Sequence, residues 1–242
     1  MRKAGLIIIA AILFGFGTGC QSSGKAALRT QKDPIALVSV VSNWDIIWKG
    51  EDPINPDNAG PLVKRSLRAD PDMALVSNAD ELITNAEVLI QDNITDAGII
   101  TLADKQTVLN SGAYRGAGIN KYQINREMVK PGDYAFVDYR DKNFPPALAA
   151  ETGIQRSMFV EFDFTKSMGT GAGKFGNCRA NVDMSVRILD ANGKTLYRTT
   201  ISLQSRDTTK VSNGVYSQSG LMSLFDSAIT DAVYEFLDQL EN

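Results

Sequence analysis

The chain has 242 residues, a length that suits one large domain or two small ones. Its 25 Lys and Arg against 28 Asp and Glu give a formal net charge of −3, which argues against nucleic-acid binding because that needs a basic surface. Histidine is absent, so His-dependent triads and His-containing zinc sites are excluded and the usual general base near neutral pH is missing. We therefore expect no enzyme, no cofactor, no metal site and no nucleic-acid partner.

The beginning of the chain has the pattern of an export signal. Arg2 and Lys3 precede a largely apolar run over 4–16, and small residues then lead to Cys20. That run is about 13 residues long, whereas roughly 20 are needed to span a bilayer. The segment resembles the lipobox of bacterial lipoproteins, in which this thiol is lipidated and becomes the new N-terminus. Gly17 departs from it, since a larger aliphatic residue is usual there.

This resemblance implies that 1–19 is a signal peptide and that Cys20 carries the lipid (palmitate) that anchors the protein in the cell envelope. The expected location is the outer membrane, with the protein facing the periplasm. A plain cleaved signal is the alternative. Residues 20–33 then form the lipidated cysteine and a flexible tether, and 34–242 form a single periplasmic domain. Cys178 would have no intrachain partner, and we interpret it as a small buried residue, with a reactive thiol as the alternative.

The mature chain is more acidic than the whole one. Loss of Arg2 and Lys3 with the signal changes the formal net charge from −3 to −5. This balance argues against the domain lying flat on an anionic membrane.

Elements of both kinds follow in the first half of the domain. The uncharged, β-branched run at 34–43 predicts a strand buried on both faces, and the proline-containing stretch 43–72 predicts a loop. Apolar residues at three-and-four spacing predict a helix that is capped by Asn78, runs through Thr95 and ends at Gly98. The segment 99–109 predicts a strand that runs into a helical turn.

The region 110–146 has little pattern, apart from a strand expected at 133–139. A short helix is predicted at 145–153, with its prolines in the first turn. Strict alternation then predicts two antiparallel strands, around 158–165 and 181–189. A turn containing Asn192 and Gly193 leads into a third strand.

A final helix is predicted from about 219 to 240, with a continuous apolar stripe. The fold class is therefore α+β: a mixed sheet with an antiparallel C-terminal meander, covered on one face by amphipathic helices that include the long C-terminal one.

The order of these elements resembles a known group. The segments that carry the resemblance are 35–41, 78–96, 99–109, 148–164 and 182–202. They resemble bacterial lipoproteins of the penicillin-binding-protein activator (LpoB) group and the CsgG-type curli export proteins, with a domain that is similar to the N-terminal domain of TolB. The resemblance covers about 34–240 and implies partner binding without catalysis.

Three functions follow from the resemblance and the composition. The first is a lipid-anchored accessory protein that binds an envelope partner, such as a peptidoglycan synthase, and modulates cell-wall synthesis or envelope assembly. The second is a homo-oligomeric subunit of a CsgG-like outer-membrane export complex. The least favoured is an enzyme acting on an envelope glycan.

Several side chains are candidates for these roles. Trp44 and Trp48 are the predicted partner contacts because tryptophan is enriched at interface hot spots, although both could instead fold back onto the domain edge. The strand pattern also places charged residues on one exposed, open face of the sheet, where they are either solvated or, for a glycan-active enzyme, an acid and base pair. These residues are Glu161, Asp163, Asp183 and Arg187.

The glycine-rich segment 171–176 satisfies GxGxxG, but a strand and not a helix is predicted after it. We interpret it as a hairpin tip and not as a nucleotide site. Glu51, Asp52, Asn55 and Asp57 could gather a calcium ion but lack the EF-hand pattern.

Overall fold

A computed structural model describes residues 33–50, 59–172 and 175–242, together with Ala26 and Leu28. The predicted lipid site at Cys20, most of the predicted tether and the acidic residues of 51–58 lie outside the described residues. The elements in chain order are β1 (Ala36–Ser42), β2 (Ile47–Trp48), α2 (Pro61–Ala69), β3 (Met73–Ala74), α3 (Asp80–Ala97), α4 (Lys105–Leu109), α5 (Gly112–Arg115), α6 (Lys121–Asn125), α7 (Phe144–Thr152), β4 (Arg156–Ala172), β5 (Phe175–Asp190), β6 (Thr195–Gln204), β7 (Thr209–Ser212), β8 (Val215–Ser217) and α8 (Gln218–Glu241).

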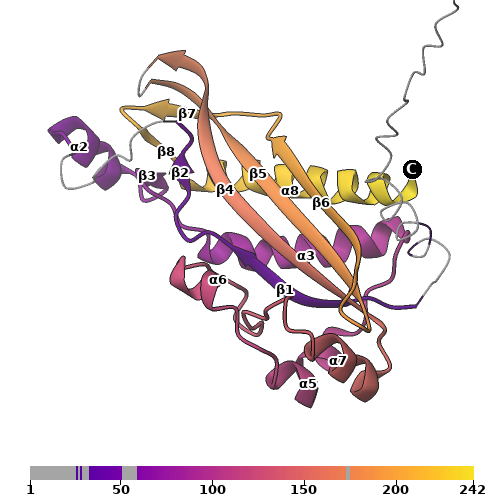
Figure 1. Cartoon of the computed structure of the whole chain (residues 1–242). Helices are drawn as coiled ribbons and strands as arrows, with labels where there is room; N and C mark the ends of the chain where they lie inside the picture. The colour runs from indigo at the N-terminus through magenta and orange to yellow at the C-terminus, as the bar shows by residue number, and fades with distance from the viewer. Residues whose placement is uncertain (1–25, 27, 29–32, 51–58, 173–174) are drawn as a thin grey trace, which may run out of the picture.

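The strands form one curled mixed sheet, shown in Figure 1. The first strand, β1, pairs in parallel with β4, whereas β4, β5 and β6 form the predicted antiparallel meander. Beyond the meander, β5 also pairs with β7, and β7, β8 and β3 continue the sheet toward the end that carries α2. All residues of β1 are buried, as its uncharged sequence predicts.

Two long helices cover one face of the sheet and close the core (Figure 1). Helix α8 packs on β5 and β6, and α3 packs on α8 and β1. On β4 the buried side chains include Phe164, whose ring lies 5.4 Å from that of Phe225 on α8. The fold class is therefore confirmed. So is the predicted stripe of α8, all of which is buried: Leu221, Leu224, Phe225, Ala228, Ile229, Ala232, Val233, Phe236, Leu237 and Leu240.

The interpretation of 43–72 as loop is wrong in part. It contains the short strand β2 and the helix α2, which begins at Pro61. Proline is tolerated in the first turn of a helix because its missing N–H has no intrahelical partner there. The proline that indicated a loop therefore marks a helix start.

The predicted helix at 78–96 is present as α3, with a different cap. Its N-cap is Ala79, which makes no side-chain cap bond, while Asn78 Oδ1 accepts from the Asp80 N–H at 3.2 Å. Gly98 ends the helix in the left-handed conformation (φ 63°), as predicted.

Two predicted strands are wrong. In 99–109 the chain makes a single bridge from Leu102 to Ile35 and then forms α4, and in 133–139 it makes a single bridge from Val137 to Ile119. Both segments run alongside other parts of the chain for too short a distance to form a ladder. The helix predicted at 145–153 is present as α7, closed by Gly153 in the left-handed conformation.

The described residues of the segment 171–176 end β4 and begin β5, as expected for a hairpin tip, and 173–174 lie outside the described residues. Gly171 and Gly176 face each other across the two strands, with φ values of 121° and 146°. A Cβ at Gly171 would come within 2.1 Å of the Phe175 carbonyl oxygen, so the close approach of the strands requires glycine. Cys178, nearby on β5, is buried and free, as predicted.

Among the helices in the described part of the chain, none has the length and apolar character needed to cross a bilayer. Within the same residues, acidic and cysteine side chains do not gather in groups of three that could hold a metal ion.

Candidate functional site

The two tryptophans that are predicted to contact a partner differ in their exposure to solvent. The side chain of Trp44 is exposed (40%), whereas Trp48 is buried (5%) and its ring meets that of Tyr216 edge to face, with centroids 6.1 Å apart. Trp44 can therefore contact a partner directly, and Trp48 could do so only after the core opens. Partner binding by either residue stays a prediction.

The charged residues predicted on the exposed sheet face do lie there, but the face is not open as expected. It carries a cleft of about 410 Å³, whose floor is the sheet. Cross-strand neighbours form this floor in rows, because side chains on one face of neighbouring strands lie side by side. One row runs from Phe159 on β4 to Arg187 on β5 and Arg198 on β6, and the next contains Glu161 and Ser185.

The opposite wall of the cleft comes from α6 and the segment that follows it. Tyr122 and Gln123 on α6 line the cleft together with Val137, Tyr139 and Arg140. Asn120 caps α6, because its side-chain oxygen accepts from the N–H groups of residues 122 and 123 at 3.2 and 3.3 Å. This wall belongs to the region in which the sequence showed little pattern.

Arg187 is the central charged side chain of the cleft. Its guanidinium carbon lies 4.1 Å from the centroid of the Tyr139 ring, a cation–π contact, and the Tyr139 ring in turn meets Phe159 edge to face at 6.3 Å. Burial and the neighbouring charge of Arg198 lower the pKa of Arg187 from its usual value. The side chain is therefore held in place and partly desolvated.

The two arginines stand directly opposite each other on β5 and β6. Like charges in such a cross-strand pair repel each other, so an anion placed between them would relieve the repulsion. A third arginine, Arg140, lines the cleft and forms an ion pair with Asp138 at 2.9 Å.

Acidic groups lie further along the same face. Glu161 accepts a bond of 3.5 Å from the Gln123 amide nitrogen, and Asp163 stands opposite Asp183 in the next row. The Gln123 amide oxygen is buried and has no hydrogen-bond partner among the described residues. The face thus offers a basic end and an acidic end.

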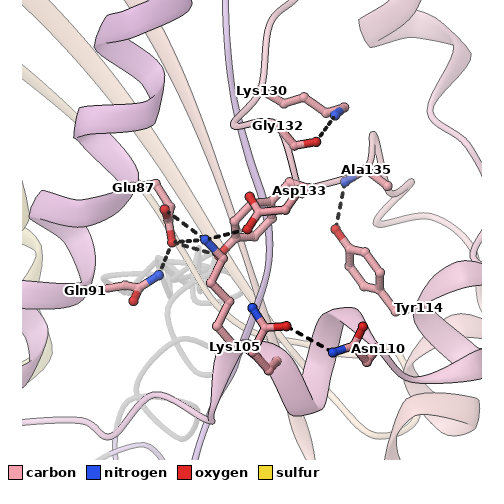
Figure 2. Close-up of polar contacts among 11 residues, drawn as sticks. Glu87, Gln91, Lys105, Asn110, Tyr114, Lys130, Gly132, Asp133 and Ala135 are labelled. Carbon is pink, nitrogen blue, oxygen red and sulfur yellow. Dashed lines mark hydrogen bonds and ion pairs between the residues drawn. The ribbon is translucent and has the colours of Figure 1, made fainter.

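A partly buried polar cluster joins the cleft wall to α3 and α4 (Figure 2). Lys105 lies between Glu87 of α3, at 3.2 Å, and Asp133, at 3.0 Å. These carboxylates outweigh the opposing effect of burial and raise the pKa of Lys105. The Tyr134 hydroxyl also donates to Glu87 at 3.3 Å. Tyr114 accepts from the Ala135 N–H at 2.8 Å.

The part of the cluster at 133–135 stands directly before Val137 and Tyr139 of the cleft wall in the chain. Backbone bonds then tie the wall together, from the Asn120 N–H to the Phe136 oxygen at 2.7 Å and from the Asp138 N–H to the Gly118 oxygen at 2.8 Å. The Asp141 carboxylate also accepts from the Gly118 N–H at 2.9 Å. The wall is therefore set in position without a ligand.

Sequence reasoning found Glu161 and Arg187 but missed the rest of the cleft. The alternation in 195–204 could have placed Arg198 beside Arg187 once the hairpin turn was assigned. Tyr122, Gln123, Tyr139 and Arg140 gave no signal, because they lie in short helical turns and irregular backbone.

No protein-family model matches the chain, and no curated protein matches it. Among solved structures, the C-terminal domain of LpoB from Salmonella enterica is similar at 10% identity, over 76% of this chain and 94% of that one, with a TM-score of 0.28. The lipoprotein GNA1162 from Neisseria meningitidis is similar at 15% identity, over 84% and 99%, with a TM-score of 0.31. Similarity this low does not identify a function, so the proposal below rests on the residues of this chain.

Proposed function

We propose that this chain is a lipid-anchored envelope protein that acts by binding a partner protein and carries out no reaction itself. The anchor is proposed from the signal-like beginning of the chain and its Cys20. The partner site is the cleft on the outer sheet face. The sequence resemblance to the penicillin-binding-protein activator group makes a peptidoglycan synthase the first partner to test.

One observation carries the binding proposal: Arg187 and Arg198 stand side by side in a cleft, with Tyr139 stacked on one of them. Arginine and tyrosine are enriched among the residues that dominate protein interfaces. Two adjacent guanidinium groups suit the carboxylates of an acidic segment, because each can bind a carboxylate through paired hydrogen bonds. The expected partner surface is therefore acidic.

The proposal is tested by photo-crosslinking in living cells. A photoreactive amino acid replaces Tyr122, which is exposed and lines the cleft, or Tyr234, which is exposed on α8. We expect a discrete crosslinked protein from position 122 and none from position 234. The double change Arg187→Glu and Arg198→Glu should abolish this product.

The matched control places the same charge change outside the cleft, at the exposed Lys194 and Lys210. This variant should crosslink from position 122 as the parent protein does. Equal capture at both reporter positions, or capture that survives the arginine changes, would refute the cleft as the partner site.

A further inference from the structure

We propose that helix α2 is a second membrane contact, which docks its exposed face on an anionic phospholipid bilayer. The proposal goes beyond the partner site and beyond the lipid anchor. It also does not depend on the anchor, because α2 would dock whether or not Cys20 carries lipid. The helix lies at the end of the molecule that carries β2 and β3, away from the start of β1 (Figure 1).

The first observation is that α2 has no buried residue, although it spans nine residues. It contacts β3 and β8, with Val63 and Leu67 half-buried. At 100° per residue these two side chains, four positions apart, form the stripe that faces the sheet. The remaining faces of the helix are open to solvent.

The second observation is the charge of those open faces. Lys64, Arg65 and Arg68 gather on one side of α2, where they line a shallow hollow with Pro61 and Ala69. The helix contains three basic residues and no acidic one. It is therefore a basic surface on a chain whose overall charge is negative.

The third observation is an apolar edge beside the basic side. Leu62 is 70% exposed, more than any other large apolar side chain among the described residues. Met73, on the strand β3 that α2 contacts, is also exposed (37%). A helix with lysine and arginine on one side and exposed apolar groups on the next fits the interface of a bilayer.

The net charge of the whole domain does not oppose this contact. Charges are screened over about 8 Å at physiological ionic strength, so a bilayer at α2 interacts mainly with the helix and with Asp70 and Asp72 directly after it. Anionic lipids attract basic segments of this kind, and three side chains together should favour docking on the order of a hundredfold, roughly fivefold each. A domain held by a tether alone can rotate freely, whereas docking of α2 would fix which way the cleft faces.

The test uses the full, membrane-isolated protein in vesicles, with an environment-sensitive fluorophore on Leu62→Cys. Cys178 is buried and should not react, and parent protein treated with the fluorophore gives the background from any other thiol. On vesicles that contain phosphatidylglycerol we expect a blue shift, which 0.5 M salt should reverse. On pure phosphatidylcholine vesicles we expect no shift.

Two variants serve as controls. Combined Lys64→Gln, Arg65→Gln and Arg68→Gln should reduce the docked-to-undocked ratio on the order of a hundredfold. Because α2 buries no side chain, the melting temperature of this triple variant should match that of the parent protein. A fluorophore on Ile124→Cys, an exposed position on α6, should not shift on either kind of vesicle.

The outcomes separate this proposal from the lipid anchor. Flotation with pure phosphatidylcholine vesicles reports the anchor, whereas the shift at position 62 reports α2. The docking proposal is overturned by no shift on anionic vesicles, by a shift that persists in the glutamine variant, or by equal shifts at positions 62 and 124.

Discussion

Lys166 provides the sharpest test of the packing, because the fold buries its charge. Its side chain on β4 is 2% exposed, and its ammonium group donates to the Ile46 carbonyl. The same nitrogen lies 5.3 Å from the Trp48 ring centroid and 5.0 Å from that of Tyr216. Burial lowers the pKa of Lys166 to about 8 from its ordinary 10.5.

The sign of the effect follows from proton binding. Between pH 8 and 10.5 the unfolded chain holds a proton on Lys166 that the folded chain has released. The free energy of unfolding therefore increases as pH rises through this window. Below the window Lys166 is charged in the folded protein, and its buried charge lowers the free energy of unfolding. From pH 7 to pH 9.5 this single group should add about 2 kcal/mol to the free energy of unfolding.

The perturbation is Lys166→Met, which keeps a long apolar stem and removes the charge. Urea unfolding of both proteins at pH 7 and pH 9.5 gives four free energies of unfolding. Cys178 and Tyr216, whose pKa values burial raises to about 11 and about 12, oppose the effect at high pH but are present in both proteins. The difference between the proteins therefore reports Lys166 together with its electrostatic interaction with Cys178.

We expect the parent protein to gain about 2 kcal/mol relative to Lys166→Met over this range. A relative change below about 0.5 kcal/mol, or one in the opposite direction, would show that the ammonium group reaches solvent and would refute the reasoning.

Three further predictions concern other parts of the chain. Cys20→Ala should move the protein from the membrane to the soluble fraction, and unchanged membrane binding would contradict the lipid anchor. Trp48→Ala should lower the free energy of unfolding by about 3–5 kcal/mol, because the Trp48 ring is buried. Trp44→Ala should lower it by less than about 1 kcal/mol, because Trp44 is exposed. Similar losses for the two variants would contradict this packing. Glu87→Gln should lower the free energy of unfolding by about 1–3 kcal/mol, because it weakens the bonds to Lys105. Asp133 is more exposed, so Asp133→Asn should lower it by less than about 1 kcal/mol. Urea unfolding measures both changes.

The sequence predicts those parts of the fold in which a regular pattern repeats. The stripe of α8 and the alternation of β4 and β5 each follow from one local period, and both are confirmed. The sequence did not predict the helix α2, because proline usually indicates a loop. Proline is also compatible with a helix when it lies in the first turn, as Pro61 does.

The candidate site was harder to predict than the fold. Glu161 and Arg187 are on the exposed face because strand alternation puts them there, but the cleft depends on the wall opposite. That wall is held by contacts such as Lys105 with Glu87 and Asp141 with Gly118, which join residues 18 and 23 positions apart. Polar contacts at such separations leave no periodic pattern in a single sequence.

The parallel pairing of β1 with β4 has a consequence for the order of folding. Asn43, just after β1, accepts from the backbone N–H of Phe164 on β4, 121 positions later. Half of the chain therefore separates the first strand from its neighbour in the sheet, and contacts of high sequence separation form slowly. If the chain is exported as proposed, such a delay would keep this part of it extended during passage through a narrow translocation channel.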